Sequence, residues 1–145
     1  MSVFADSSAL VKLYADEEAA DLVRRVPVLI ASALARVEVP AALWRKARLS
    51  EMAPEDATVL VAEFEADYAG AGNEPPRFVA LSVSAPILAE AARLSAVHGL
   101  RASDAVQLSS ARAASAAEPS CQTVAAFDRH LREAAAAEGF ALLPA

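Results

Sequence analysis

Short apolar runs alternate with longer stretches of helical character along this chain. We expect strands at residues 2–5, 28–31, 78–81, 122–125 and 140–143. Each segment between two runs is long enough for one or two helices, and strands that alternate with such helices are typical of a parallel sheet. The sequence therefore predicts an α/β fold with a mainly parallel central sheet.

Capping residues predict where several of the helices begin. Ser7 or Ser8 can cap a helix that runs to Tyr14, Asp16 can cap a second over residues 17–25, and Ser103 can cap one over 104–115. The remaining helices are expected at residues 32–49, 54–69, 84–98 and 128–138. Glycines that follow the last two of these favour a helix end there.

Length and composition restrict the class of protein. A chain of 145 residues most simply forms one domain over 1–145. The hydrophobic fraction is 56%, but no run approaches the roughly 20 apolar residues of a membrane span. The N-terminus has no basic segment before its first acid, and the single Cys121 cannot form an internal disulfide. We therefore expect a cytoplasmic protein without a membrane segment.

The net charge of −6 does not resemble the basic footprint of most nucleic-acid-binding proteins. Cations gather only locally, at residues 24–25, 45–48 and 129–132, where a solvated helix face is the ordinary explanation. The net charge therefore argues against nucleic-acid binding, and a metal ion among the acids or the local cation clusters would weaken this objection.

Four acidic residues lie beside apolar neighbours in separate parts of the chain: Asp6, Glu38, Asp104 and Asp128. An unpaired charge beside Val, Ala or Phe is costly, and a divalent cation among several carboxylates would offset that cost. Asp6 and Asp128 follow expected strands, at the sheet edge where α/β proteins bind ligands. Asp6 alone also fits a turn, Asp104 the first turn of a helix and Asp128 a helix cap, so spacing leaves their convergence open. Glu38 lies on an apolar helix face, where an acid has no ordinary structural role.

The segments around these acids resemble the motifs of PIN-domain nucleases, especially the VapC toxin of VapBC toxin–antitoxin pairs. VFADSSALVKLY at 3–14 is similar to the opening motif, ALARVE at 33–38 to the second, LRASDAVQL at 100–108 to the third and FDRHL at 127–131 to the fourth. The motifs follow in the family's order over nearly the whole chain. One departure is Ala126, where the family often has Thr or Ser, and it bears on a second metal or on the rate.

The resemblance implies a three-layer α/β/α sandwich that cleaves RNA with Mg²⁺ or Mn²⁺. Asp6, Asp104 and Asp128 would bind the metal, and Glu38 would bind it or orient the attacking water. The family also implies a small antitoxin partner, bound at the early helices.

A homodimer is expected as well. The helical segments at residues 10–14 and 34–44 carry more apolar surface than a monomer of this size would cover.

Acids also gather at the strand ends of another class of α/β domain, which this sequence excludes. A phosphoacceptor receiver domain needs an acid after the third strand and a lysine after the fifth, but Leu81-Ser82 ends the third and no lysine follows Lys46. Two alternatives stay open: a PIN-like nuclease of RNA maturation or decay outside toxin–antitoxin systems, and an inactive PIN-like module that only binds partners. The four acids favour a nuclease, whereas Ala126 keeps the module open.

Overall fold

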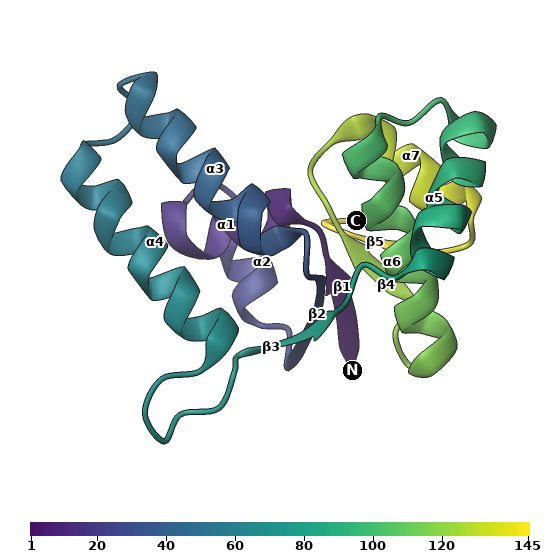
Figure 1. Ribbon diagram of the computed structural model, residues 1–145, viewed down its shortest axis with the longest axis horizontal. Helices are drawn as coiled ribbons and strands as arrows, with labels where there is room; N and C mark the ends of the chain where they lie inside the picture. Colours follow the sequence, from purple (N-terminus) through teal and green to yellow (C-terminus); the bar gives the residue numbers. More distant parts are fainter.

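The computed structural model describes residues 1–145 and contains a five-stranded sheet in which all neighbouring strands are parallel (Figure 1). The strands are β1 (Ser2–Ala5), β2 (Val28–Ser32), β3 (Phe78–Leu81), β4 (Thr123–Ala125) and β5 (Ala141–Leu143). Their order in the sheet is β3-β2-β1-β4-β5, so β1 lies at the centre. The predicted α/β class with a parallel sheet is confirmed.

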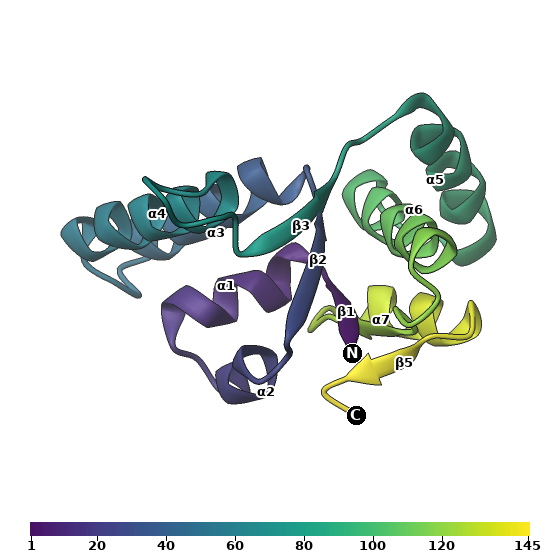
Figure 2. The ribbon, with the colours of Figure 1, turned by 90° about the horizontal axis from the view of Figure 1, so that it is seen from below.

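Seven helices cover the two faces of this sheet and complete a three-layer sandwich (Figure 2). They are α1 (Ser7–Ala15), α2 (Ala20–Arg24), α3 (Ala35–Arg48), α4 (Pro54–Ala69), α5 (Ala85–His98), α6 (Ala102–Ala117) and α7 (Arg129–Ala137). The first four helices pack on one side of the sheet and the last three on the other.

Alternation along the central strands divides the buried residues between two cores. Successive side chains of a strand point to opposite faces of the sheet. Val3 and Ala5 therefore enter the core beneath α1–α4, whereas Phe4 enters the core beneath α5–α7. Leu29 and Ile30 in β2 divide in the same way. One short strand thus contributes to both layers of the sandwich.

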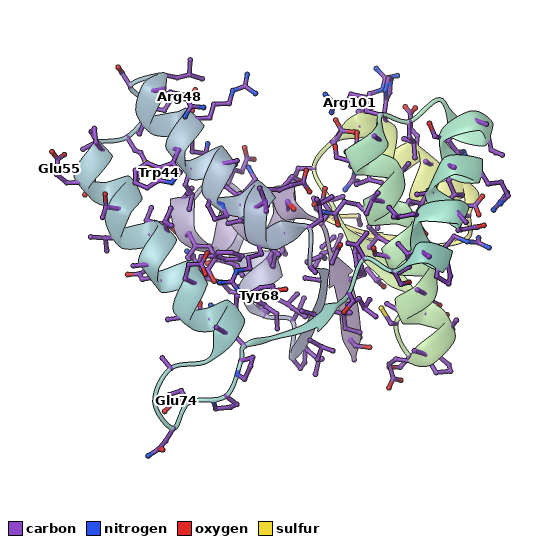
Figure 3. All side chains as sticks on the ribbon, in the orientation of Figure 1. Trp44, Arg48, Glu55, Tyr68, Glu74 and Arg101 are labelled. Carbon is purple, nitrogen blue, oxygen red and sulfur yellow. The ribbon has the colours of Figure 1, made fainter.

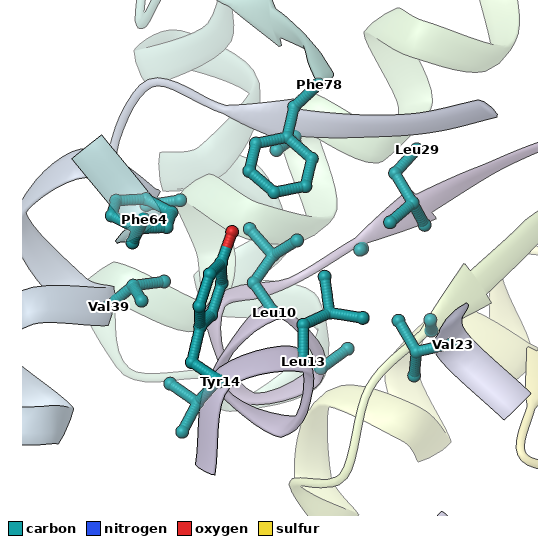
Figure 4. Packing of buried hydrophobic residues seen from close by; sticks show 14 of the residues in the cluster. Leu10, Leu13, Tyr14, Val23, Leu29, Val39, Phe64 and Phe78 are labelled. Carbon is teal, nitrogen blue, oxygen red and sulfur yellow. The ribbon is translucent and has the colours of Figure 1, made fainter. Parts of the chain in front are cut away.

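Aromatic side chains hold α1 and α4 to the sheet in the first of these cores (Figure 4). Phe64 is fully buried, and its ring meets Tyr14 edge to face with 5.6 Å between centroids. Phe78 packs against Phe64 from β3. The Tyr14 hydroxyl donates a 2.6 Å hydrogen bond to Asp67, so its polar end is satisfied at the margin of the core.

Apolar residues of α1 are covered within the single chain. Leu10 and Tyr14 are buried, so the expectation of excess apolar surface on this first helix is wrong. The part of the expectation that concerns α3 holds, because Val37 is 69% exposed and Trp44 37% exposed.

None of the helices is both long and apolar enough to cross a membrane.

Several helices begin elsewhere than their capping signals predicted. Asp6, rather than Ser7 or Ser8, caps α1, because its carboxylate follows β1 directly and accepts a hydrogen bond from the amide of Ala9. Asp16 ends α1 in the left-handed region instead of starting α2. At α1 several capping residues stood side by side, whereas α2 begins at Ala20 after Ala19 without any side-chain cap.

The starts of α3 and α6 differ for a different reason. Pairing with β3 extends β2 to Ser32, so α3 begins at Ala35. In α6 the helix begins at Ala102 after Arg101, which places Ser103 inside the first turn instead of at the cap. By contrast, Asp128 caps α7 as predicted, accepting from the amide of Leu131 at 2.9 Å.

Candidate active site

Asp6 stands between the end of β1 and the start of α1, at the centre of the sheet. Its amide donates to the carbonyl of Ala125 in β4, which places it at the carboxyl ends of two adjacent strands. Only 4% of the residue is exposed. Oδ1 accepts hydrogen bonds from Ser8 Oγ at 2.6 Å and from the Ala9 amide at 3.0 Å, whereas Oδ2 has no partner in the protein and is not fully enclosed.

The Asp6 carboxyl is held in an environment that disfavours its charge. Burial is the largest cause, and it raises the pKa of Asp6 from 3.8 to about 7 despite the hydrogen bonds from Ser8 and Ala9. The carboxylates of Glu38 and Asp104 raise this pKa further by repulsion. Three acids, from the β1–α1 junction, α3 and α6, are therefore close enough to interact electrostatically.

Glu38 projects from the first turn of α3 toward α1 and α6. Its Oε1 accepts a hydrogen bond from Ser7 Oγ at 2.9 Å and one from Gln107 Nε2 at 2.7 Å. Its other oxygen, Oε2, has no hydrogen-bond partner in the protein. The acid on an apolar helix face thus has polar partners, and they come from two other elements.

Arg101 links the two remaining acids. Its guanidinium lies 3.2 Å from Oδ2 of Asp104 and 3.9 Å from Oδ1 of Asp128, and its side chain is 79% exposed. Asp128 also accepts the capping hydrogen bond of α7 through Oδ2. The structure therefore places Asp104 and Asp128 beside the same exposed cation.

The four predicted acids share a pattern in their hydrogen bonding. In each, one carboxylate oxygen is held by hydrogen bonds, and the other accepts none within the protein. As the side chains stand, no three His, Cys, Asp or Glu residues are close enough together to hold a metal ion. The donor chemistry nonetheless fits a hard divalent cation, because carboxylate oxygens are the ligands that Mg²⁺ prefers and Asp6 is a desolvated carboxylate with an open oxygen.

Sequence reasoning did not identify four further residues at this site: Ser7, Ser8, Arg101 and Gln107. The two serines contact the acids with their side chains instead of capping α1. Gln107 lies one helical turn after Asp104, and that spacing could have placed it on the same face of α6. No local signal could have paired it with Glu38, which is 69 residues away in sequence.

The departure at Ala126 has a structural counterpart. Ala126 is fully buried in the core beneath α5–α7 and offers no hydroxyl. The hydroxyl beside Asp6 comes instead from Ser8, whose Oγ also accepts a 3.0 Å hydrogen bond from the amide of Phe127. Ser8 thus ties Asp6 to the segment that carries Asp128.

The comparisons with known proteins concern the fold. No family model matches the chain, and no curated protein matches it either. PAE2754 from Pyrobaculum aerophilum matches with a TM-score of 0.64 at 23% identity, over 99% of this chain and 85% of that one. FitAcB from Neisseria gonorrhoeae matches with a TM-score of 0.60 at 19% identity, over 97% of this chain and 95% of that one. At these identities the likeness shows the fold, an α/β arrangement consistent with a PIN-like three-layer sandwich.

Proposed function

We propose that this protein is a metal-dependent endoribonuclease that hydrolyses RNA phosphodiester bonds at Asp6, Glu38, Asp104 and Asp128. The observation that carries the proposal is the environment of the Asp6 carboxyl, which is buried beside two other acids. A carboxyl with a pKa of about 7, an open oxygen and two acidic neighbours is a costly arrangement for structure alone. A bound cation would offset that cost and make use of the open oxygens.

Asp6, Asp104 and Asp128 would hold Mg²⁺ or Mn²⁺, and Glu38 would bind the ion or orient the attacking water. The ion, when bound, would activate a water and offset the charge that develops on the phosphate. Hydrogen bonds from Ser7 and Gln107 fix the orientation of the Glu38 side chain. A hydrogen bond from Ser8 fixes that of the Asp6 side chain. The exposed Arg101 would bind a phosphate of the RNA beside Asp104 and Asp128, since a guanidinium matches phosphate geometry.

The biological role that we propose is that of the toxin in a type II toxin–antitoxin pair. The support is the VapC-like motif order together with apolar side chains that the single chain leaves uncovered on α3, among them Val37 and Trp44. A small antitoxin would cover this surface, and a homodimer is the other assembly that it permits. Co-purification of the chain with the product of its neighbouring gene tests the pairing, and recovery of the chain alone would contradict it.

Cleavage of total RNA by the purified chain tests the nuclease. The reaction is run with Mn²⁺, with EDTA, and with the Asp104→Asn variant. Glu55→Gln is the matched control, because Glu55 is an exposed acid at the start of α4, far from Arg101 (Figure 3). We expect discrete fragments with Mn²⁺ from the wild type and from Glu55→Gln, and none with EDTA or from Asp104→Asn.

Two other results would favour different functions. Metal-dependent cleavage without any antitoxin partner would favour a PIN-like nuclease of RNA maturation or decay. Absence of both cleavage and Mn²⁺ binding would favour a PIN-like interaction module. The observation on the side of the module is that no three of the acids lie at metal-binding distance from one another as they stand, together with the missing hydroxyl at Ala126.

A further inference from the structure

Gln107 lies on α6, one helical turn after Asp104, and only 2% of it is exposed. Its Nε2 donates to Oε1 of Glu38 at 2.7 Å and to Oγ of Ser7 at 3.0 Å. Ser7 Oγ in turn donates to the same oxygen of Glu38 at 2.9 Å. The three side chains, from α1, α3 and α6, therefore form a closed ring of hydrogen bonds.

The ring determines how the Gln107 amide is oriented. An ionised carboxylate only accepts hydrogen bonds, so the Gln107 atom that faces Glu38 must be the nitrogen. That nitrogen donates toward both Glu38 and Ser7. The amide oxygen, Oε1, is left buried without a hydrogen-bond partner.

A buried side-chain oxygen without any partner, such as Oε1 of Gln107, is unusual within this molecule. The other buried side-chain oxygen without a hydrogen bond, Oε1 of Glu17, is ion-paired with Lys46. An unmet buried acceptor destabilises the folded state, and an apolar side chain of the same length would avoid the cost. Packing therefore does not account for a glutamine at this position, whereas its hydrogen bond to Glu38 does.

We propose that Gln107 is a positioning residue for the acidic site. It fixes the side chain of Glu38 through one oxygen, together with Ser7, and leaves the other oxygen of Glu38 free to act on the ion or on water. This inference rests on the proposed function, because the orientation of Glu38 matters to a reaction only if Glu38 takes part in one. Partners that orient metal-binding groups typically account for 10- to 100-fold in metal affinity or activity.

Two variants at position 107 separate positioning from packing. Gln107→Met keeps an unbranched side chain of similar size and removes both donors. Gln107→Glu keeps the shape and sets a second carboxylate against Glu38. Ser109→Ala is the matched control, since Ser109 is equally buried on α6 but donates to the carbonyl of Ile87, away from the acids.

The ring itself is tested in metal-free protein by nuclear magnetic resonance. The side-chain amide signals of Gln107 are identified by their absence from Gln107→Met. We expect them to shift in Ser7→Ala and to stay in place in Ser109→Ala. Unchanged signals in Ser7→Ala would overturn the inference without reference to any activity.

The positioning role is tested by calorimetric titration with Mn²⁺ alone and by single-turnover RNA cleavage at saturating Mn²⁺. We expect both variants at position 107 to lose about 10- to 100-fold in Mn²⁺ affinity or in cleavage rate, with KM for RNA unchanged. Ser109→Ala should stay within about twofold of wild type. Urea unfolding establishes which variants are folded. If Gln107→Met does not fold, the positioning role is judged from Gln107→Glu.

The outcomes distinguish the two proposals. Wild-type affinity and rate in a folded Gln107 variant would overturn the positioning role and leave the nuclease intact. A wild type that neither binds Mn²⁺ nor cleaves RNA would refute the proposed function, and the positioning role would fall with it.

Discussion

Replacement of Asp6 by Asn would remove a buried charge and keep the hydrogen bonds of the α1 cap. Asn Oδ1 can accept from Ser8 Oγ and from the Ala9 amide as the carboxylate does, and Asn caps helices about as well as Asp. Asp6 is 4% exposed, so solvent does little to screen its charge. The substitution therefore isolates the cost of ionising this one carboxyl inside the fold.

The size of that cost follows from the pKa. Burial raises the pKa of Asp6 from 3.8 to about 7, which at about 1.4 kcal/mol per pH unit amounts to ~4 kcal/mol. Because the folded state binds the proton more tightly than the unfolded state, this contribution is fully present below pH 3.8 and is lost as the pH rises through 7. Above that pH the metal-free wild type carries an ionised, poorly solvated Asp6, and the Asn variant does not.

Urea unfolding in EDTA at several pH values measures the difference. At pH 8 we expect the free energy of unfolding of Asp6→Asn to exceed that of the wild type by up to ~4 kcal/mol, which corresponds to roughly 10 °C in melting temperature. Near pH 4 the gap should fall below about 1 kcal/mol. Asp21→Asn, at an exposed acid, should show no such gap at either pH. Equal unfolding free energies of wild type and Asp6→Asn at pH 8 would refute the account of Asp6 as a destabilised carboxylate.

Three further outcomes are expected. Mn²⁺ should raise the melting temperature of the wild type at pH 8 more than that of Asp6→Asn, and EDTA should reverse the rise; equal shifts in a thermal melt would argue against a metal at Asp6. Phe64→Ala should cost about 3–5 kcal/mol in urea unfolding because Phe64 is fully buried, whereas Val59→Ala, at an exposed position of α4, should cost little. Arg101→Ala should lower the rate of RNA cleavage about 10- to 100-fold, because a charged hydrogen bond to phosphate is lost, without weakening Mn²⁺ binding. Arg129→Ala is the control at another exposed arginine. An unchanged cleavage rate in Arg101→Ala would exclude phosphate binding by Arg101.

Much of the fold was predictable because it depends on local patterns. The apolar runs in β1–β3 are short and bounded by capping or turn residues, so their position and their parallel arrangement follow from periodicity and from the helices between them. The same reasoning placed Asp6 and Asp128 just past strand ends, and Asp104 in the first turn of a helix. It failed at the start of α1, where three adjacent residues could each cap the helix and only contacts with the acids separate Asp6 from Ser7 and Ser8.

The sequence by itself determined the α/β class, the order of the elements and the positions of the four acids along them. Only the tertiary structure decided which side chains meet. The bond from Gln107 to Ser7 joins residues 100 positions apart, and it depends on the order of strands in the sheet and on the rotation of α6 about its axis. Burial of Asp6 and its raised pKa have the same origin, because desolvation is produced by all the elements that pack around a group and not by its neighbours in sequence.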